Sequence, residues 1–240
     1  MNEVDSGANL SNTRELNAFQ RVVGVFLSPR DTYESINRKP DWVVPFIILV
    51  LVSLVFTMFT LPISMPEQMQ KQKEKLEQDG KSEEEIEAAV AIGEKIGKIV
   101  APIGAVVGTA IMILLMSAIF LFIGNIVLGG ETTYRKIFSV YTYTSLIGVL
   151  AMALKLPLIL NKQTMDIHFS LSMLMPAEQS ESFLFYLLKS IEVFSIWHFA
   201  LLAIAFSVLY KFTMKKSAWT MGILFGIYAL ISATIMKIFA

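Results

Sequence analysis

The sequence predicts an all-helical protein that crosses a membrane several times, and two observations lead to that prediction. Apolar residues make up 55% of the 240 residues and charged residues only 17%, which is more apolar material than one soluble core encloses. Several apolar runs also reach the roughly 20 residues that a helix needs to cross a bilayer. We therefore predict a polytopic integral membrane helical bundle with five transmembrane helices, N-terminal amphipathic surface helices and an extramembrane helical hairpin.

The N-terminal part precedes the first predicted span. Residues 1–13 are small and polar and are predicted to form a disordered tail. Residues 14–41 are predicted to form two amphipathic helices on the membrane surface, with Arg21 off the apolar face of the first. That apolar face consists of Leu16, Phe19, Val23, Phe26 and Leu27. In the second helix, Ser28 is a candidate cap and Pro29 suits the first helical position.

Residues 42–240 are predicted to form the membrane domain. Trp42 opens the first span at the level where indole rings prefer to lie, and Gly129 with Gly130 ends the second. The five predicted spans are residues 42–62, 99–128, 137–160, 190–211 and 217–238. Two extramembrane inserts, residues 63–98 and 161–182, separate the spans.

The first insert is predicted to be a helical hairpin outside the bilayer. Asp79 and Gly80 interrupt its helical pattern, and Ser82 with Glu85 forms a capping box for the second arm. The second arm continues into the second span without a stop, so one long helix is expected to stand above the membrane.

The second insert contains a stretch in which apolar residues alternate with others, between residues 165 and 175. This period fits either a strand or an extended segment on lipid, and the pattern does not choose between them. A fourth helix is predicted to begin near Ser180 or Ser182 and to continue without interruption to residue 211.

The distribution of basic residues predicts the topology, because positive residues are retained on the cytoplasmic side. With the N-terminus inside, most basic residues near the spans lie on one side. These are Arg30, Arg38, Lys39, Arg135, Lys136, Lys211, Lys215 and Lys216. The opposite side has Lys95, Lys98, Lys162, Lys189 and Lys237. The prediction is a cytoplasmic N-terminus and a C-terminus outside.

Several classes of function are disfavoured by what the chain lacks. A formal net charge of zero gives no basic surface for nucleic acid. The absence of cysteine excludes disulfides and thiol catalysis, and no phosphate loop, nucleophile elbow or zinc-protease motif is present. His198 lacks a cluster of further ligands, since the other histidine, His168, lies in the second insert. We therefore predict no enzyme active site, no metal site and no cofactor.

Ionisable and polar residues within spans are the remaining candidates for function. Lys155 lies near the end of the third span and is expected to extend toward the membrane surface. Glu192 and His198 are six residues apart, which predicts different faces of one helix and no proton-transferring pair. Asn125, Tyr143 and His198 are candidates to line a polar path for a small solute.

Three stretches together resemble the Yip1 domain family. They are VGVFLSPRDTYESI at residues 23–36 with KPDWVVP at 39–45, GGETTYRKIFSVYTYTSL at 129–146, and SIEVFSIWHFALLAIAFSVL at 190–209. The resemblance implies a five-span membrane domain with a cytoplasmic N-terminus that acts as an adaptor rather than an enzyme. Eukaryotic members are associated with Rab-type GTPases, but the short segment before the first span resembles prokaryotic members, which implies the cytoplasmic membrane of a prokaryote.

The residues that match the family's pattern are further candidates. Tyr134 and Arg135 follow the paired glycines, and Glu192 stands before Phe194 and Trp197, as an acid does in many relatives.

The leading hypothesis is a non-catalytic membrane scaffold or adaptor that lies in a lipid bilayer as a homo-oligomer or with a membrane protein partner. The alternative is a small-solute permease or channel. A third hypothesis, a lipid-handling enzyme, rests only on the clustering of Glu131, Tyr134 and Arg135.

Overall fold

The structure is a computed structural model, and it describes residues 15–176 and 182–238. The predicted disordered tail, residues 1–13, lies outside the described residues. The helices are α1 (Ala18–Leu27), α2 (Pro29–Arg38), α3 (Val43–Gln78), α4 (Glu83–Phe122), the π-helix η1 (Ile123–Val127), α5 (Tyr134–Thr144), α6 (Leu146–Lys162), the 3₁₀-helix η2 (Leu171–Leu174), α7 (Phe183–Ser190), α8 (Val193–Leu209) and α9 (Met214–Ile238). The described part of the chain contains no strand, only one isolated β-bridge.

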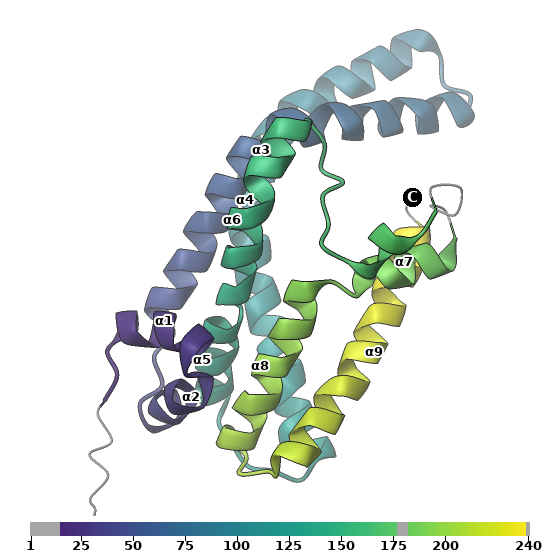
Figure 1. Cartoon of the computed structure of the whole chain (residues 1–240). Coiled ribbons are helices and arrows are strands. Elements are labelled where there is room, and N and C mark those ends of the chain that lie inside the picture. Colours follow the sequence, from purple (N-terminus) through teal and green to yellow (C-terminus); the bar gives the residue numbers. More distant parts are fainter. Residues whose placement is uncertain (1–14, 177–181, 239–240) are drawn as a thin grey trace, which may run out of the picture.

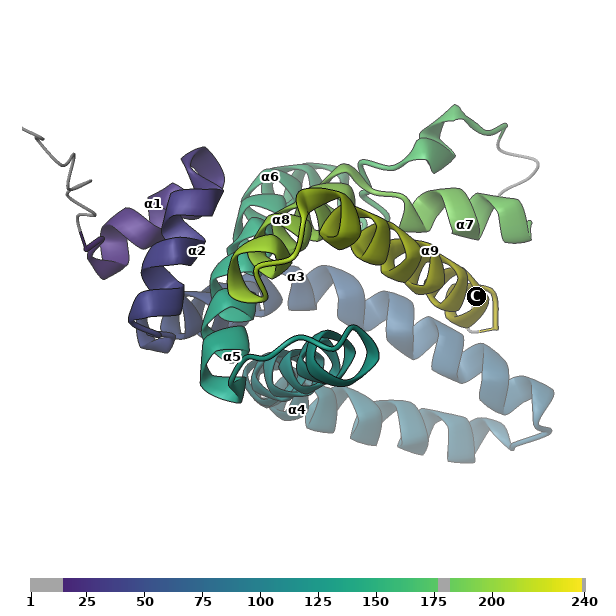
Figure 2. The same ribbon diagram turned by 90° about the horizontal axis from the view of Figure 1, so that it is seen from below.

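The helices form a bundle whose two ends differ. At one end lie α1, α2 and the connections that join η1 to α5 and α8 to α9 (Figure 1). At the other end lie α7 and a long hairpin formed by α3 and α4, which leans away from the bundle. Seen from below, α1 and α2 stand at one side of the bundle (Figure 2).

Within the described residues, four helical segments are long and apolar enough to cross a membrane. They are Val43–Gln78, Glu83–Val127, Tyr134–Lys162 and Met214–Ile238. The third of them is α5 followed directly by α6, with a turn at Ser145. α8 is apolar but has only 17 residues, or about 25 Å at 1.5 Å per residue, and is not among the four.

The predicted hairpin forms, but it is not separate from the spans. α3 continues through Pro62 and Pro66 to Gln78, so the predicted end of the first span at Pro62 is not the end of a helix. A proline removes one donor and favours a bend, which the rest of a long helix tolerates. At the tip, Gly80 has φ 73°, and Ser82 with Glu85 makes the predicted capping box.

The prediction of an uninterrupted fourth helix is wrong. α7 begins after Ser182, whose side chain caps it, but it ends at Ser190, and α8 begins at Val193. Glu192 between them is extended, with φ −100° and ψ 145°, because its backbone pairs with Ser170 in the isolated bridge. A contact with the second insert therefore divides the predicted helix.

The described part of the second insert contains one isolated bridge and the short helix η2, and no strand. Val193 N donates to the Phe169 carbonyl at 3.1 Å, and η2 follows the bridge. Met173 and Leu174 in η2 are 68% and 82% exposed, so the apolar end of the insert points outward.

The two N-terminal helices are held differently from the prediction of two surface helices. In α2, Tyr33 and Ile36 are fully buried against α5 and α8, and the Tyr33 hydroxyl lies 2.8 Å from Thr144 Oγ1. Ser28 makes no side-chain cap. α1 does expose apolar side chains, but it buries Arg21, which was predicted off the apolar face.

Candidate functional site

A charged pair lies between two helices of the bundle. Lys155 Nζ of α6 and Glu192 Oε1, at the start of α8, are 2.5 Å apart, and their side chains are 21% and 18% exposed. Phe169 N also donates to Glu192 Oε1, at 3.2 Å. The carboxylate therefore has a charged partner and a backbone partner, and the Lys155 ammonium ends on Glu192.

A second pair lies in the insert beside the first. Lys189 Nζ is 2.6 Å from Asp166 Oδ1, and this hydrogen bond lowers the pKa of Asp166. Burial lowers the pKa of His168, which stands 3.5 Å from the same carboxylate. Together with Lys155 and Glu192, these side chains line a cavity of about 230 Å³.

A neighbouring cavity of about 370 Å³ continues from there into the bundle. It contains Glu192 and His198, and it shares Glu192, Ser195 and Tyr228 with the smaller cavity. The His198 ring stands edge-on to Tyr141, with centroids 5.6 Å apart. Glu192 precedes α8 and is extended, so the helical period from which different faces were predicted for Glu192 and His198 does not apply to it.

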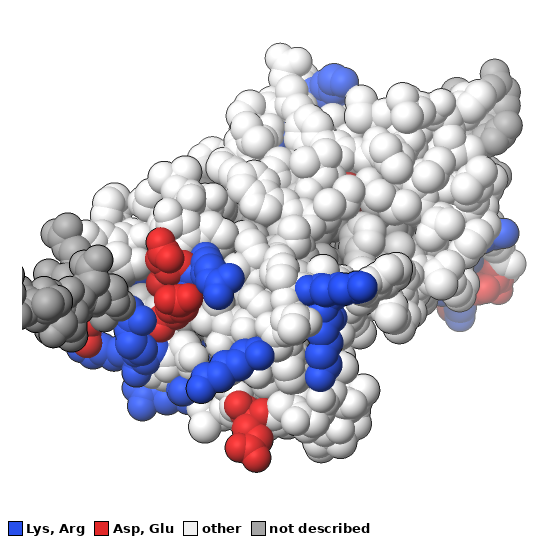
Figure 3. Space-filling view, turned by 60° about the horizontal axis from the view of Figure 1, so that its bottom comes forward, with Lys and Arg blue, Asp and Glu red and all other residues white. Residues whose placement is uncertain are grey.

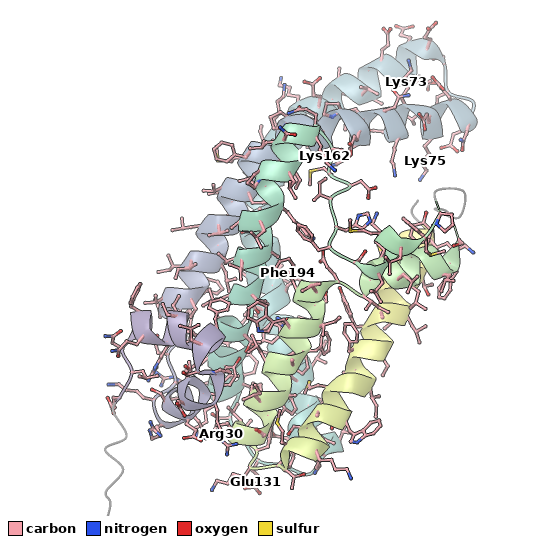
Figure 4. The ribbon with its side chains drawn as sticks, in the orientation of Figure 1. Arg30, Lys73, Lys75, Glu131, Lys162 and Phe194 are labelled. Carbon is pink, nitrogen blue, oxygen red and sulfur yellow. The ribbon has the colours of Figure 1, made fainter. Side chains whose placement is uncertain are left out.

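A third cavity, of about 430 Å³, joins the second through Phe199 and Tyr228 and lies between α4 and α9. Apolar side chains line it almost completely. Because neighbouring cavities share lining residues, we treat the three together as one groove, with the charged smallest cavity as its mouth and the apolar third cavity at its far end. Phe194, which lines the second cavity, lies between α6 and α8 (Figure 4). A groove of this kind accepts an apolar chain or a small neutral molecule.

The other predicted site residues lie at the opposite end of the bundle. Asn125 closes the connection after η1, since its Nδ2 donates to the Thr132 carbonyl at 3.0 Å and its Oδ1 accepts from Thr132 N at 3.3 Å. The Tyr134 hydroxyl donates to the Leu114 carbonyl at 3.0 Å. Glu131 is exposed at the end of the molecule (Figure 4).

Aromatic rings fill the space beside the paired glycines. The Tyr210 and Phe212 rings stack with an interplanar angle of 12°, and a Cβ at Gly124 or Gly130 would collide with Tyr210. Lys216 Nζ lies 3.7 Å from the centre of the Phe212 ring and donates to the Leu128 carbonyl. Gly124 and Gly130 therefore serve close packing, whereas Gly129 has φ 67° and open space around it. Sequence reasoning could have proposed the packing role only by pairing these glycines with residues about 80 positions away.

The predicted site residues thus fall into separate groups. Glu192 and His198 share the groove, whereas Trp197 stands edge-on to Phe26 of α1, with centroids 6.2 Å apart. Tyr143 is fully buried against the N-terminal helices, so the proposed solute path through Asn125, Tyr143 and His198 does not lie in one cavity. Within residues 15–176 and 182–238, no group of three or more His, Cys, Asp or Glu residues has the arrangement of a metal site.

Comparison with known families gives one match. The family described as Yip1 domain matches residues 23–236, which is nearly the whole chain and includes the groove and both bundle ends. Comparisons with curated proteins and with solved structures give no match.

Proposed function

Because the chain belongs to the Yip1 domain family, whose members are generally non-enzymatic membrane proteins, we propose that it is a non-catalytic membrane scaffold or adaptor. The observation that carries the proposal is the hairpin of α3 and α4, which extends beyond the rest of the bundle (Figure 1). A helical arm that stands clear of its own bundle offers both faces to another protein.

The hairpin is ordered by its own contacts. Gly93 and Gly97 of α4 face α3, where a Cβ would come within 3.0 Å of Gln72 and 3.1 Å of Met65. Small residues at this spacing let two helices approach closely. The outer side of the same α4 segment carries Ile92 and Ile96, which are 60% and 52% exposed. The arm is therefore closely packed inside and leaves apolar side chains outside.

Position-specific crosslinking tests the scaffold proposal. Benzoylphenylalanine at exposed Gln68 or Glu84, on the two arms, should crosslink in native membranes to one protein of defined mass. The same label at exposed Lys215, at the opposite end, is the matched control and should not. Gentle-detergent purification should then give an intact mass of fixed stoichiometry, either several copies of this chain or this chain with its partner. A monomer that gives equal crosslinks from both ends would refute the proposal.

The proposed topology has five spans, with α8 as the fourth and α9 as the fifth. α8 runs from the end that carries α7 to the end that carries the α8–α9 connection, and α9 returns (Figure 1). Blue side chains gather at the end where α1, α2 and α9 begin (Figure 3). The bias of basic residues toward this end supports a cytoplasmic N-terminus and a C-terminus outside, in the cytoplasmic membrane of a prokaryote.

A second candidate, passage of a small solute, is favoured by the Lys155–Glu192 pair, because ionisable groups within a bundle are costly and often functional. Proteoliposomes containing the protein should then take up a small neutral solute such as glycerol faster than empty ones, and Glu192→Gln should change the rate. Equal rates for protein-containing and empty vesicles would exclude this candidate for that solute.

A further inference from the structure

Arg21 is a buried cation that forms no ion pair within the described part of the chain. Its side chain is on α1 and only 3% of the residue is exposed. Nε and Nη2 donate to Ser35 Oγ at 3.2 and 3.0 Å, Nη2 also donates to the Ser35 carbonyl, and Nη1 donates to the Lys39 carbonyl at 3.0 Å. Every one of these acceptors is uncharged. Among the described residues, no carboxylate lies within 4.0 Å of the guanidinium.

This arrangement is unusual because a buried charge normally has a partner of opposite sign. The four hydrogen bonds hold the guanidinium in place, but they do not neutralise it. Arg21 also lines a cavity of about 520 Å³ at the end of the bundle where α1, the α2–α3 connection and α5 meet. The planar fork of an arginine is suited to bind an anion that enters such a cavity.

The other charges around the cavity leave it positive. Lys39 is 3.6 Å from Glu15, so these two charges offset one another. Asp41 accepts from Val43 N at 3.2 Å, and Arg135 donates only a long bond, of 3.5 Å, to the Pro40 carbonyl. The lining therefore holds one more cation than acids, and Arg21 with Arg135 lacks an ion-pair partner among the described residues.

The position of the cavity indicates where the anion comes from. Trp42 lines it at the N-terminal end of α3, where the first membrane-crossing segment begins. Indole rings concentrate at the level of lipid head groups. We infer that this cavity binds a phosphate group, supplied by the head group of an anionic phospholipid in the leaflet around the N-terminal end of α3. Arg21 holds one face of the phosphate and Arg135 approaches it from the outside.

The test measures lipid retention by the full chain. Purified protein in detergent is titrated with phosphatidylglycerol or with phosphatidylcholine, and bound lipid is counted by native mass spectrometry. Phosphatidylglycerol should bind more tightly, and Arg135→Gln should weaken it about fivefold, since one basic residue near an anionic lipid contributes about that factor. Arg21→Gln should weaken it about tenfold or more.

A second variant, a matched control and inorganic phosphate complete the test. Arg21 also holds α1 on α2, so Arg135→Gln is the variant that tests the site if Arg21→Gln does not fold. Lys215→Gln is the matched control, because Lys215 is an exposed cation at the same end and outside the cavity. Inorganic phosphate that displaces the lipid, or that binds alone and is lost in Arg135→Gln, would assign the same site to a free anion. Equal retention of the two lipids, or equal effects of Arg135→Gln and Lys215→Gln, would overturn the inference.

Discussion

The Lys155–Glu192 pair gives the sharpest test of how the bundle is held together. Glu192→Gln preserves the shape of the side chain and its bond from Phe169 N, but it leaves Lys155 without a counter-charge. Removing one partner of a buried pair costs about 3–5 kcal/mol. Because the two side chains are 21% and 18% exposed, we expect a cost of about 2–3 kcal/mol.

This cost should be visible as a lower midpoint of thermal unfolding in detergent. For a chain of this size, about 1 kcal/mol shifts the midpoint by roughly 2–4 °C, so Glu192→Gln should lower it by about 5–10 °C. Adding Lys155→Met to that variant should recover at least half of the loss, because two uncharged side chains replace the pair. Glu94→Gln is the control, since its pair with Lys98 is exposed and worth less than about 1 kcal/mol.

The double variant tests whether Lys155 and Glu192 interact. If Lys155 and Glu192 interact, their substitutions are not additive. Should the effects of Glu192→Gln and Lys155→Met simply add to within about 0.5 kcal/mol, the pair would not stabilise the bundle. The short contact would then be a consequence of the fold rather than a cause of it.

Three further predictions follow from single contacts. Gly124→Ala should destabilise the protein by about 1–3 kcal/mol, because the alanine Cβ would collide with Tyr210. Gly222→Ala is the control, since it adds a Cβ in open space and should not destabilise the protein. Equal unfolding midpoints for the two variants would contradict the prediction. Burial lowers the pKa of His168, so the unfolded state binds more protons and the free energy of unfolding should fall as the pH drops below about 6.5. His168→Gln should reduce this dependence of stability on pH. An unchanged dependence would exclude His168 as its source. Because the chain has no cysteine, Val23→Cys accepts a single fluorophore on the exposed face of α1. Spin-labelled lipid should quench this fluorophore if that face inserts into the leaflet. Quenching no greater than at Lys75→Cys, on the hairpin, would place α1 in water.

The apolar runs predicted the long helices because length and composition are local properties of the chain. The cap at Ser82 was also predicted, since Glu85 is only three residues away. The break before α8 could not be predicted, because Glu192 is extended through contacts with Phe169 and Ser170, more than 20 residues earlier. Helical periodicity therefore does not describe the position of Glu192 relative to His198.

Proline is tolerated inside the longest apolar helices. Pro62 and Pro66 lie within α3, which continues to Gln78 because each proline removes only one hydrogen bond and the helix packs against α4. Helical spacing predicted only that Arg21 lies off the apolar face of the first helix. Its burial depends on Ser35 and Lys39, which come from a different helix and its cap, and no pattern within α1 reveals them.

The mouth of the groove and the Arg21 cavity are suited to different ligands, because the charges in the groove are paired and Arg21 is not paired within the described residues. At the mouth of the groove, Lys155 faces Glu192 and Lys189 faces Asp166, so an incoming anion would have to displace a carboxylate. The groove is therefore suited to an apolar or neutral occupant. Arg21 has only uncharged acceptors among the described residues, so an anion gains an interaction there and displaces nothing. A head group at Arg21 and an uncharged molecule in the groove are consequently independent, and Glu192→Gln should leave the retention of phosphatidylglycerol unchanged.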